Sequence, residues 1–154
     1  MNKRHMRAAI KLASDNIDKG GGPFGAVVVK DGKIVGRGVN RVTANNDPTA
    51  HAEVTAIRNA CKKLKTFDLS DCEIYTSCEP CPMCLGSIYW ARIHHIYYGN
   101  TQADAAKINF DDSFIYRQIE KPIGSREIPE EQMMHEESIK TFEKWNNKED
   151  KTPY

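Results

Sequence analysis

The first forty positions change from a helical to a strand pattern of apolar residues. Apolar residues recur at helical spacing from about residue 1 to residue 19, and Gly20-Gly21-Gly22-Pro23 ends that pattern. Two short apolar runs with β-branched residues follow, at residues 24–30 and 33–40. The Asp31-Gly32 pair between them is typical of a two-residue hairpin turn. This part of the chain therefore predicts a helix followed by a β-hairpin.

The middle of the chain predicts helices that alternate with strands. Asp47 and Pro48 suit the N-cap and the first position of a helix, which we expect to continue over residues 50–64. Three further elements are expected in alternation: a strand at 72–77, a helix that opens at 80–82 and extends to about 92, and a strand at 94–99. Strands separated by helices indicate an α/β fold.

Beyond residue 101 the periodicity weakens. A short helical stretch is expected near Ala103, followed by the segment F-D-D-S-F-I-Y-R-Q-I and a last helix over residues 131–145. The tail K-E-D-K-T-P-Y is polar and, on the sequence alone, is expected to fray. The 154 residues fit a single domain, in which residues 131–154 form a C-terminal helix and tail.

Composition and charge add little to this pattern. The 22 basic and 21 acidic side chains give a net charge of +1, which provides no argument for a nucleic-acid or membrane partner. No apolar run approaches the ~20 residues that cross a bilayer. Lys11 interrupts the apolar part of the basic N-terminus, so a secretory signal is not expected, and a cytoplasmic location is the default.

The sequence contains a metal-binding pattern. His51 and Glu53 stand in H-A-E, and Cys81 and Cys84 stand in P-C-P-M-C. Two cysteines three positions apart at a helix start can direct both sulfurs at one ion, and one imidazole completes three ligands. Zinc held by three protein ligands keeps a fourth position for water, which is the mark of a catalytic site. Glu53 is two residues from His51, so we expect it to carry a proton beside the site and not to bind the metal.

Other roles for these cysteines stay open. P-C-x-x-C alone is also found in structural zinc sites and redox pairs, and Cys78 extends it to C-x-x-C-x-x-C, a spacing that can hold an iron–sulfur cluster. Such a cluster needs a fourth ligand, whereas Cys61 and Cys72 lie in helix and strand patterns that suit burial. A zinc or iron–sulfur binding module without catalytic activity therefore remains the alternative to an enzyme.

The combination of H-x-E with P-C-x-x-C is the signature of zinc nucleobase deaminases. D-P-T-A-H-A-E-V-T-A-I-R and T-S-C-E-P-C-P-M-C-L-G-S-I-Y-W-A-R resemble the purine-handling branch of the cytidine-deaminase-like superfamily. Y-W-A-R, D-A-A and F-D-D-S-F-I-Y are most similar to the bacterial guanine deaminases. This resemblance implies a three-layer α/β/α fold with a central mixed five-stranded sheet and one zinc ion per chain. It also implies hydrolytic deamination of guanine to xanthine and ammonia.

The resemblance also implies roles for individual residues. Glu53 corresponds to the proton shuttle of the family, and Asp112 to an acidic residue near the substrate amine, although the adjacent Asp111 could fill that role. The zinc ligands correspond to three residues: His51, Cys81 and Cys84. The substrate-binding positions correspond to five: Phe24, Asn40, Ala52, Trp90 and Tyr154. Guanine deaminases of this type are homodimers that exchange C-terminal segments, which would bring Tyr154 to the partner's pocket.

The first rival activity is adenosine deamination in a tRNA anticodon loop. It would use the same zinc site but needs a basic surface for phosphates. The balanced net charge argues against it, and so do the acidic residues at positions 130, 131, 136 and 137. A pyrimidine deaminase fits Y-W and F-D-D-S-F less well. A small purine base is therefore the expected partner.

Overall fold

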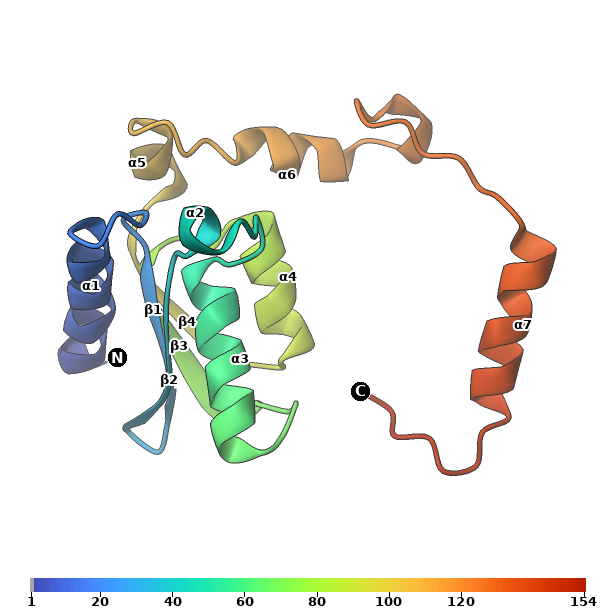
Figure 1. Cartoon of the computed structure of the whole chain (residues 1–154), viewed down its shortest axis with the longest axis horizontal. Coiled ribbons are helices and arrows are strands. Elements are labelled where there is room, and N and C mark those ends of the chain that lie inside the picture. Colours follow the sequence, from blue (N-terminus) through green and yellow to red (C-terminus); the bar gives the residue numbers. More distant parts are fainter. Residues whose placement is uncertain (1) are drawn as a thin grey trace. The chain divides into compact units, whose positions relative to one another are not determined.

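The computed structural model describes residues 2–154 (Figure 1). It divides into two compact units, one that ends at Ser113 and one that comprises Phe114–Tyr154. The first unit contains the sheet, and the second consists of helices and connecting segments. The expected N-terminal helix is observed as α1 (Lys3–Ile17), while Met1 lies outside the described residues.

The sheet of the first unit has the strand order β2-β1-β3-β4. Its strands are β1 (Gly25–Lys30), β2 (Lys33–Val39), β3 (Cys72–Cys78) and β4 (His95–Asn100). β1 pairs antiparallel with β2 and β3, and β3 pairs parallel with β4, so the sheet is mixed as expected. The hairpin turn is also confirmed, because Asp31 and Gly32 have φ values of 49° and 70°.

The expectation of a fifth strand is wrong for the described residues, where the sheet ends at β4. Directly after β4, Thr101 and Asp104 form a capping box that starts α5 (Gln102–Ala106). The next helix along the chain is α6 (Ser113–Glu120). The described chain after β4 thus contains helices and connecting segments but adds no strand to the sheet.

Helices cover both faces of the sheet and make a three-layer α/β/α arrangement (Figure 1). α1 packs on one face, where Ala9 meets Val27, Val29 and Tyr75. α3 (Ala52–Leu64) and α4 (Pro82–Trp90) lie on the other face. Their apolar residues pack against the alternate positions of β1 and β3, as the two-residue period of strands requires.

α3 approaches β2 unusually closely. Three alanines one turn apart face the strand and are fully buried: Ala52, Ala56 and Ala60. A Cβ atom at Gly38 would lie 2.0 Å from the carbonyl oxygen of Ala52, and one at Gly36 would lie 2.3 Å from that of Ala56. Only glycine fits at these two positions of β2. The contact fixes the beginning of α3, the helix that the H-A-E motif opens.

The helix with the H-A-E motif begins later than expected. The carboxylate of Asp47 accepts hydrogen bonds from the backbone N–H and the hydroxyl of Thr49, at 2.8 and 2.7 Å, and so closes a local turn. A short helix that the pattern did not predict, α2 (Val42–Asn45), precedes this turn. The prediction of Asp47 as N-cap is therefore wrong. His51 occupies that position, with φ −72° and ψ 159°.

The second unit contains most of α6, a short 3₁₀ turn η1 (Ile123–Ser125) and α7 (His135–Asn146). α7 begins four residues after the expected start at 131. No residue of this unit is buried. Its exposed apolar side chains include Phe114, Ile119, Ile139, Phe142 and Trp145. None of the helices in the described part of the chain combines the length and apolar character needed to cross a membrane.

Candidate active site

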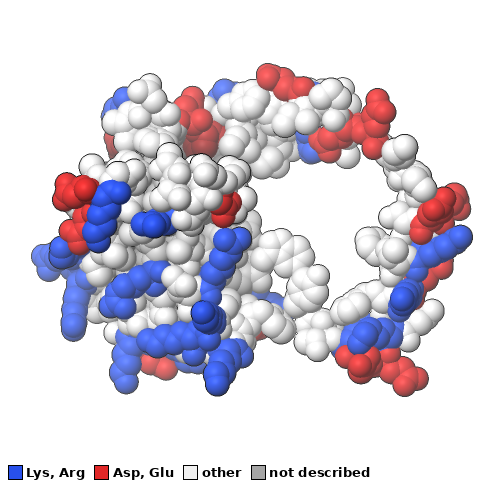
Figure 2. All heavy atoms as spheres, in the orientation of Figure 1, with Lys and Arg blue, Asp and Glu red and all other residues white. Residues whose placement is uncertain are grey.

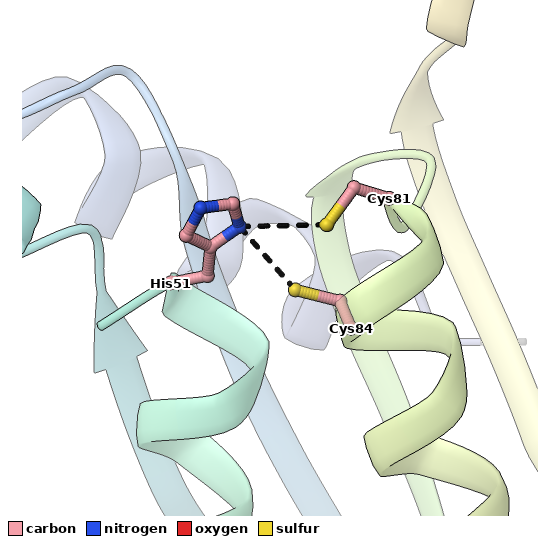
Figure 3. Close-up of side chains that lie close together, drawn as sticks. All are labelled: His51, Cys81 and Cys84. Atoms are coloured by element: carbon pink, nitrogen blue, oxygen red, sulfur yellow. Dashed lines mark hydrogen bonds between the residues drawn. The ribbon is translucent and has the colours of Figure 1, made fainter. Parts of the chain in front are cut away.

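Two helix N-termini bring three potential metal ligands together. His51 is the N-cap of α3, Cys81 is the N-cap of α4, and Cys84 lies in the first turn of α4. Figure 3 shows both sulfurs directed at the imidazole, with the Nδ1 atom of His51 3.5 Å from each Sγ atom. All three ligand atoms lie within 4.8 Å of one another. The pattern read from the sequence thus corresponds to one compact group.

The spacing of this group fits a zinc ion. Tetrahedral zinc with a Zn–S distance of ~2.3 Å and a Zn–N distance of ~2.0 Å separates a sulfur from a nitrogen ligand by about 3.5 Å. The two measured N···S distances of 3.5 Å match that edge. Two thiols and one imidazole are also the ligand types that zinc prefers, and three protein ligands leave one position for water.

Electrostatics favours the thiolate form of Cys81. A hydrogen bond from the Cys84 thiol, followed by the neighbouring His51 imidazole, holds the pKa of Cys81 below its usual value. The Cys81 sulfur in turn raises the pKa of His51. The start of α4 adds the partial positive charge of a helix N-terminus. The site therefore provides a metal-binding thiolate at neutral pH.

Glu53 lies beside the ligand group and is 6% exposed. Its Oε1 atom accepts a hydrogen bond from the Thr76 hydroxyl at 3.1 Å, and its Oε2 atom lies 3.3 Å from the Sγ atom of Cys84. Burial raises the pKa of this carboxyl group. A carboxyl group with a raised pKa next to a metal-bound water can take and return a proton near neutral pH.

The two neighbouring aspartates have different surroundings. Asp111 accepts a hydrogen bond from the backbone N–H of Ser113 at 2.9 Å, at the start of α6. Asp112 accepts one from the Gln102 side chain at 2.7 Å. Burial raises the pKa of Asp112, and the charges of Cys81 and Asp111 add to this effect. The charge of Asp112 also contributes to the raised pKa of His51, after the larger effects of Cys81 and Glu53.

Asn40 and Phe24 lie together at one end of the hairpin. The backbone N–H of Asn40 donates to the Phe24 carbonyl at 3.1 Å, and the Asn40 side-chain oxygen accepts from the N–H of Val42 at 3.3 Å. The next residue, Arg41, donates its N–H to Ala50 at 2.8 Å, so this end of β2 adjoins the turn before His51. The Phe24 ring packs edge-on against Phe110, with centroids 4.9 Å apart.

The remaining three residues expected at the substrate have separate locations. Ala52 is fully buried, with its backbone against Gly38 of β2. Trp90 is 72% exposed at the last position of α4, about 13 Å along the helix from Cys81. Tyr154 belongs to the second unit and is 73% exposed. The structure therefore brings neither Ala52 nor Trp90 into the ligand group itself.

Cys78 does not belong to the metal-binding group of the described residues. Its Sγ atom lies 3.7 Å from the carbonyl oxygen of Thr101, and burial raises its pKa to about 11. An iron–sulfur cluster would need Cys78 or another cysteine beside Cys81 and Cys84, whereas the compact group of the described residues contains only His51, Cys81 and Cys84. The geometry therefore favours a three-ligand zinc site over a cluster.

Sequence reasoning missed two residues that hold the carboxylates. Thr76 is one of several polar residues within β3, and Gln102 lies in a five-residue helix without a motif. Neither residue type nor spacing signals such a role. Only the contacts with Glu53 and Asp112 reveal it.

Comparison with known proteins identifies the family. Residues 1–100 match the cytidine and deoxycytidylate deaminase zinc-binding region. The guanine deaminase of Bacillus subtilis is 54% identical over 97% of this chain and 96% of its own. A crystal structure of guanine deaminase from that organism has a TM-score of 0.96, with 53% identity, and the match covers 100% of this chain and 99% of that one.

More distant relatives match less of the chain. A structure of guanine deaminase from Nitrosomonas europaea has a TM-score of 0.70 at 34% identity, over 73% of this chain and 65% of that chain. The tRNA-specific adenosine deaminase of Aquifex aeolicus is 40% identical, but only over 60% of this chain and 62% of its own. The chain therefore belongs to the zinc-binding cytidine and deoxycytidylate deaminase family, and within it to the guanine deaminases.

Proposed function

We propose that this protein binds one zinc ion per chain and hydrolyses the exocyclic amine of guanine, releasing xanthine and ammonia. The observation that carries the proposal is the pair of carboxylates at the ligand group. Glu53 is buried against Cys84, and Asp112 is close enough to act on His51 and Cys81. The resemblance over almost the whole chain to the Bacillus subtilis guanine deaminase supports the choice of base.

His51, Cys81 and Cys84 would hold the metal. A zinc ion held there would acidify a bound water and so would supply the nucleophile at neutral pH. Glu53 takes the proton of that water through Oε2, the oxygen on the side of Cys84, while Thr76 holds Oε1. Glu53 then delivers the proton to a ring nitrogen as the water oxygen bonds to carbon 2 of the base.

Asp112 provides the second proton path. The guanine amine lies between two ring nitrogens, so its departure as ammonia requires a proton on the nitrogen that leaves. Burial raises the pKa of Asp112, which makes its carboxyl group a better proton acceptor than an ordinary exposed aspartate. The different surroundings of the two aspartates support Asp112 over Asp111, which is engaged at the start of α6.

Asn40 is proposed to contact the base through its side-chain amide, and Phe24 to form a wall of the pocket. The ring of Phe24 is held edge-on by Phe110, which would keep a flat surface for stacking. Ala52, Trp90 and Tyr154 complete the proposed substrate-binding set. Their contacts would come from the Ala52 backbone and from the exposed aromatic rings of the other two.

The charges of the first unit bear on the RNA alternative. Figure 2 shows Lys and Arg side chains gathered on one side of this unit, and α3 carries Lys62 and Lys63 in its last turn. These two cations lie about 16 Å along the helix from His51 at its start. The charges that act on His51 come instead from Cys81, Glu53 and Asp112. Acidic surroundings at the metal suit a neutral base better than a phosphate chain.

Ammonia release tests the substrate directly. We expect the zinc-loaded protein to convert free guanine to xanthine, and to release no ammonia from adenine, cytosine, guanosine or an adenosine-containing tRNA stem-loop. The assay measures ammonia for each substrate in parallel, and the absorbance change of guanine identifies xanthine. Turnover of the stem-loop without turnover of guanine would contradict the proposal and retain only the zinc chemistry.

We also propose that the enzyme is a homodimer whose C-terminal segments are exchanged. The second unit buries none of its own side chains and exposes apolar residues on both of its longer helices. Basic side chains exceed acidic ones by three in residues 1–113, whereas acidic ones exceed basic ones by two in 114–154. An exposed apolar segment of opposite charge is suited to cover the first unit of a second copy.

A mixed-dimer experiment tests this exchange. Tyr154→Ala should lower kcat/KM for guanine about tenfold if the tail closes a pocket, since one aromatic contact contributes about 1.4 kcal/mol. Refolding this variant with Glu53→Gln should restore activity, because the intact tail of the Glu53→Gln chain then closes the pocket that still has Glu53. Light scattering measures the dimer. Absence of rescue in verified mixed dimers would show that each tail serves its own chain.

A further inference from the structure

The carboxylate of Asp112 is held by a side chain from a separate helix. The Nε2 atom of Gln102, at the first position of α5, donates a hydrogen bond of 2.7 Å to its Oδ1 atom. Gln102 and Asp112 are both half-buried. A hydrogen bond to a charged acceptor at this distance is among the stronger ones in proteins. It fixes the rotation of the carboxylate as well as its position.

Gln102 is itself anchored to the metal-binding loop. Its backbone N–H donates to the Oε2 atom of Glu79 at 2.9 Å. Glu79 lies two residues before Cys81, and its own N–H donates to the Asn100 carbonyl at 2.8 Å. The hydrogen bonds of Gln102 to Asp112 and to Glu79 therefore connect Asp112 to the loop that ends at Cys81. Asp112, Gln102 and Glu79 come from three separate stretches of the chain.

We infer that Gln102 is the positioning residue for Asp112, and that Glu79 ties this pair to the loop of Cys81. The inference rests on the proposed function, in which Asp112 exchanges a proton at the substrate amine. The side chain of Gln102 donates its hydrogen bond to the Oδ1 atom of Asp112, so the Oδ2 atom is the carboxylate oxygen proposed to exchange a proton with the substrate. An amide donates a hydrogen bond but does not give up its proton. Proton exchange at Asp112 is thereby directed to one oxygen, at a fixed distance from the metal-binding loop.

Replacement of Gln102 by Leu keeps the size of the side chain and removes the donor. We expect kcat for guanine to fall about tenfold with little change in KM, because the substrate-binding residues are untouched while the proton path is misaligned. Gln102→Ala, which retains a strong helix former in α5, should give the same result. The matched control is Lys107→Gln, an exposed residue directly after α5 whose side chain forms a surface ion pair with Asp104 at 3.0 Å. It should retain wild-type kcat.

A double-mutant cycle shows whether the effect passes through Asp112. Asp112→Asn alone should lower kcat about 100-fold, the lower end for loss of a general acid or base. Adding Gln102→Leu to Asp112→Asn should cause no further loss, because the residue to be positioned is already inactive. A further tenfold loss in the double variant would overturn the inference, since Gln102 would then act independently of Asp112.

Carboxyl carbon NMR provides a measurement that does not depend on turnover. The hydrogen bond from Gln102 lowers the pKa of Asp112, so the Asp112 resonance of zinc-loaded Gln102→Leu should titrate at higher pH than in the wild type. The neighbouring charges on Cys81, His51 and Asp111 are unchanged in this comparison. An unchanged titration would refute the positioning role. Failure of the wild type to deaminate guanine would instead refute the proposed function.

Discussion

Replacing Glu53 by Gln is expected to lower kcat for guanine about 10³-fold while the protein keeps one zinc ion per chain. Positioned acid–base groups contribute about 10²–10⁴-fold, and in the proposed mechanism Glu53 exchanges protons with both the attacking water and the base. A loss of this size corresponds to about 4 kcal/mol of transition-state stabilisation. Gln retains the shape of the side chain and its acceptor for the Thr76 hydroxyl, so the loss isolates proton transfer from packing.

Steady-state kinetics and metal analysis on the same preparation check this result. Glu73→Gln is the matched control, because it makes the same Glu-to-Gln change at a residue remote from the ligand group. Glu73 lies on β3 and accepts a hydrogen bond from the Tyr75 hydroxyl on the face covered by α1. The Glu73→Gln variant should have wild-type kcat. If Glu53→Gln retained more than a tenth of the wild-type rate with zinc bound, another group would have to carry the proton.

Replacing Cys84 by Ala should remove both zinc and activity. Cys84 is 1% exposed, and its sulfur lies at hydrogen-bond distance from both His51 and Glu53. The variant leaves two ligands, which is fewer than any catalytic zinc site uses. We expect less than about a hundredth of the wild-type zinc occupancy after dialysis, because loss of one ligand removes several kcal/mol of metal binding. Deamination of guanine should become undetectable.

Cys78→Ala is the control that separates zinc from an iron–sulfur cluster. Its sulfur contacts the Thr101 carbonyl and is not part of the ligand group, so zinc and activity should both remain. Elemental analysis should find one zinc per chain in the wild type and in Cys78→Ala. Iron in the purified wild type that disappears in Cys78→Ala would support the cluster instead. Removing zinc with a chelator and restoring activity with Zn²⁺ completes the comparison.

Sequence patterns predicted most of the first unit because they act over short distances. The Asp31-Gly32 turn predicts the hairpin and its pairing next to the turn, although the register shifts between Val28 and Val29, and the strand predicted at residues 72–77 is β3. Pro82 at the first position of α4 marked the start of that helix. His51 and Cys81 are far apart along the chain but lie in contact, because each opens a helix on the same face of the sheet.

Predictions failed where a residue suits two local structures equally well, or where interacting residues are distant in sequence. Asp47 can cap a helix or close a turn with Thr49, and the structure has the turn. After β4 the periodicity correctly predicts the short helix near Ala103, which is α5, whereas the fifth strand implied by the family resemblance is not found in the described residues. The partner of Asp112 is ten positions away, at Gln102, and no periodicity connects the two.

Both metal-binding helices begin at residues that are poor N-caps. Neither His51 nor Cys81 makes a side-chain hydrogen bond to the first turn of its helix. Ser, Thr, Asp or Asn at such a position typically adds about 1 kcal/mol of stability. Selection for thermal resistance in the absence of metal would therefore favour substitutions at the two positions that bind it. Stability-guided redesign of this protein therefore has to exempt both helix starts.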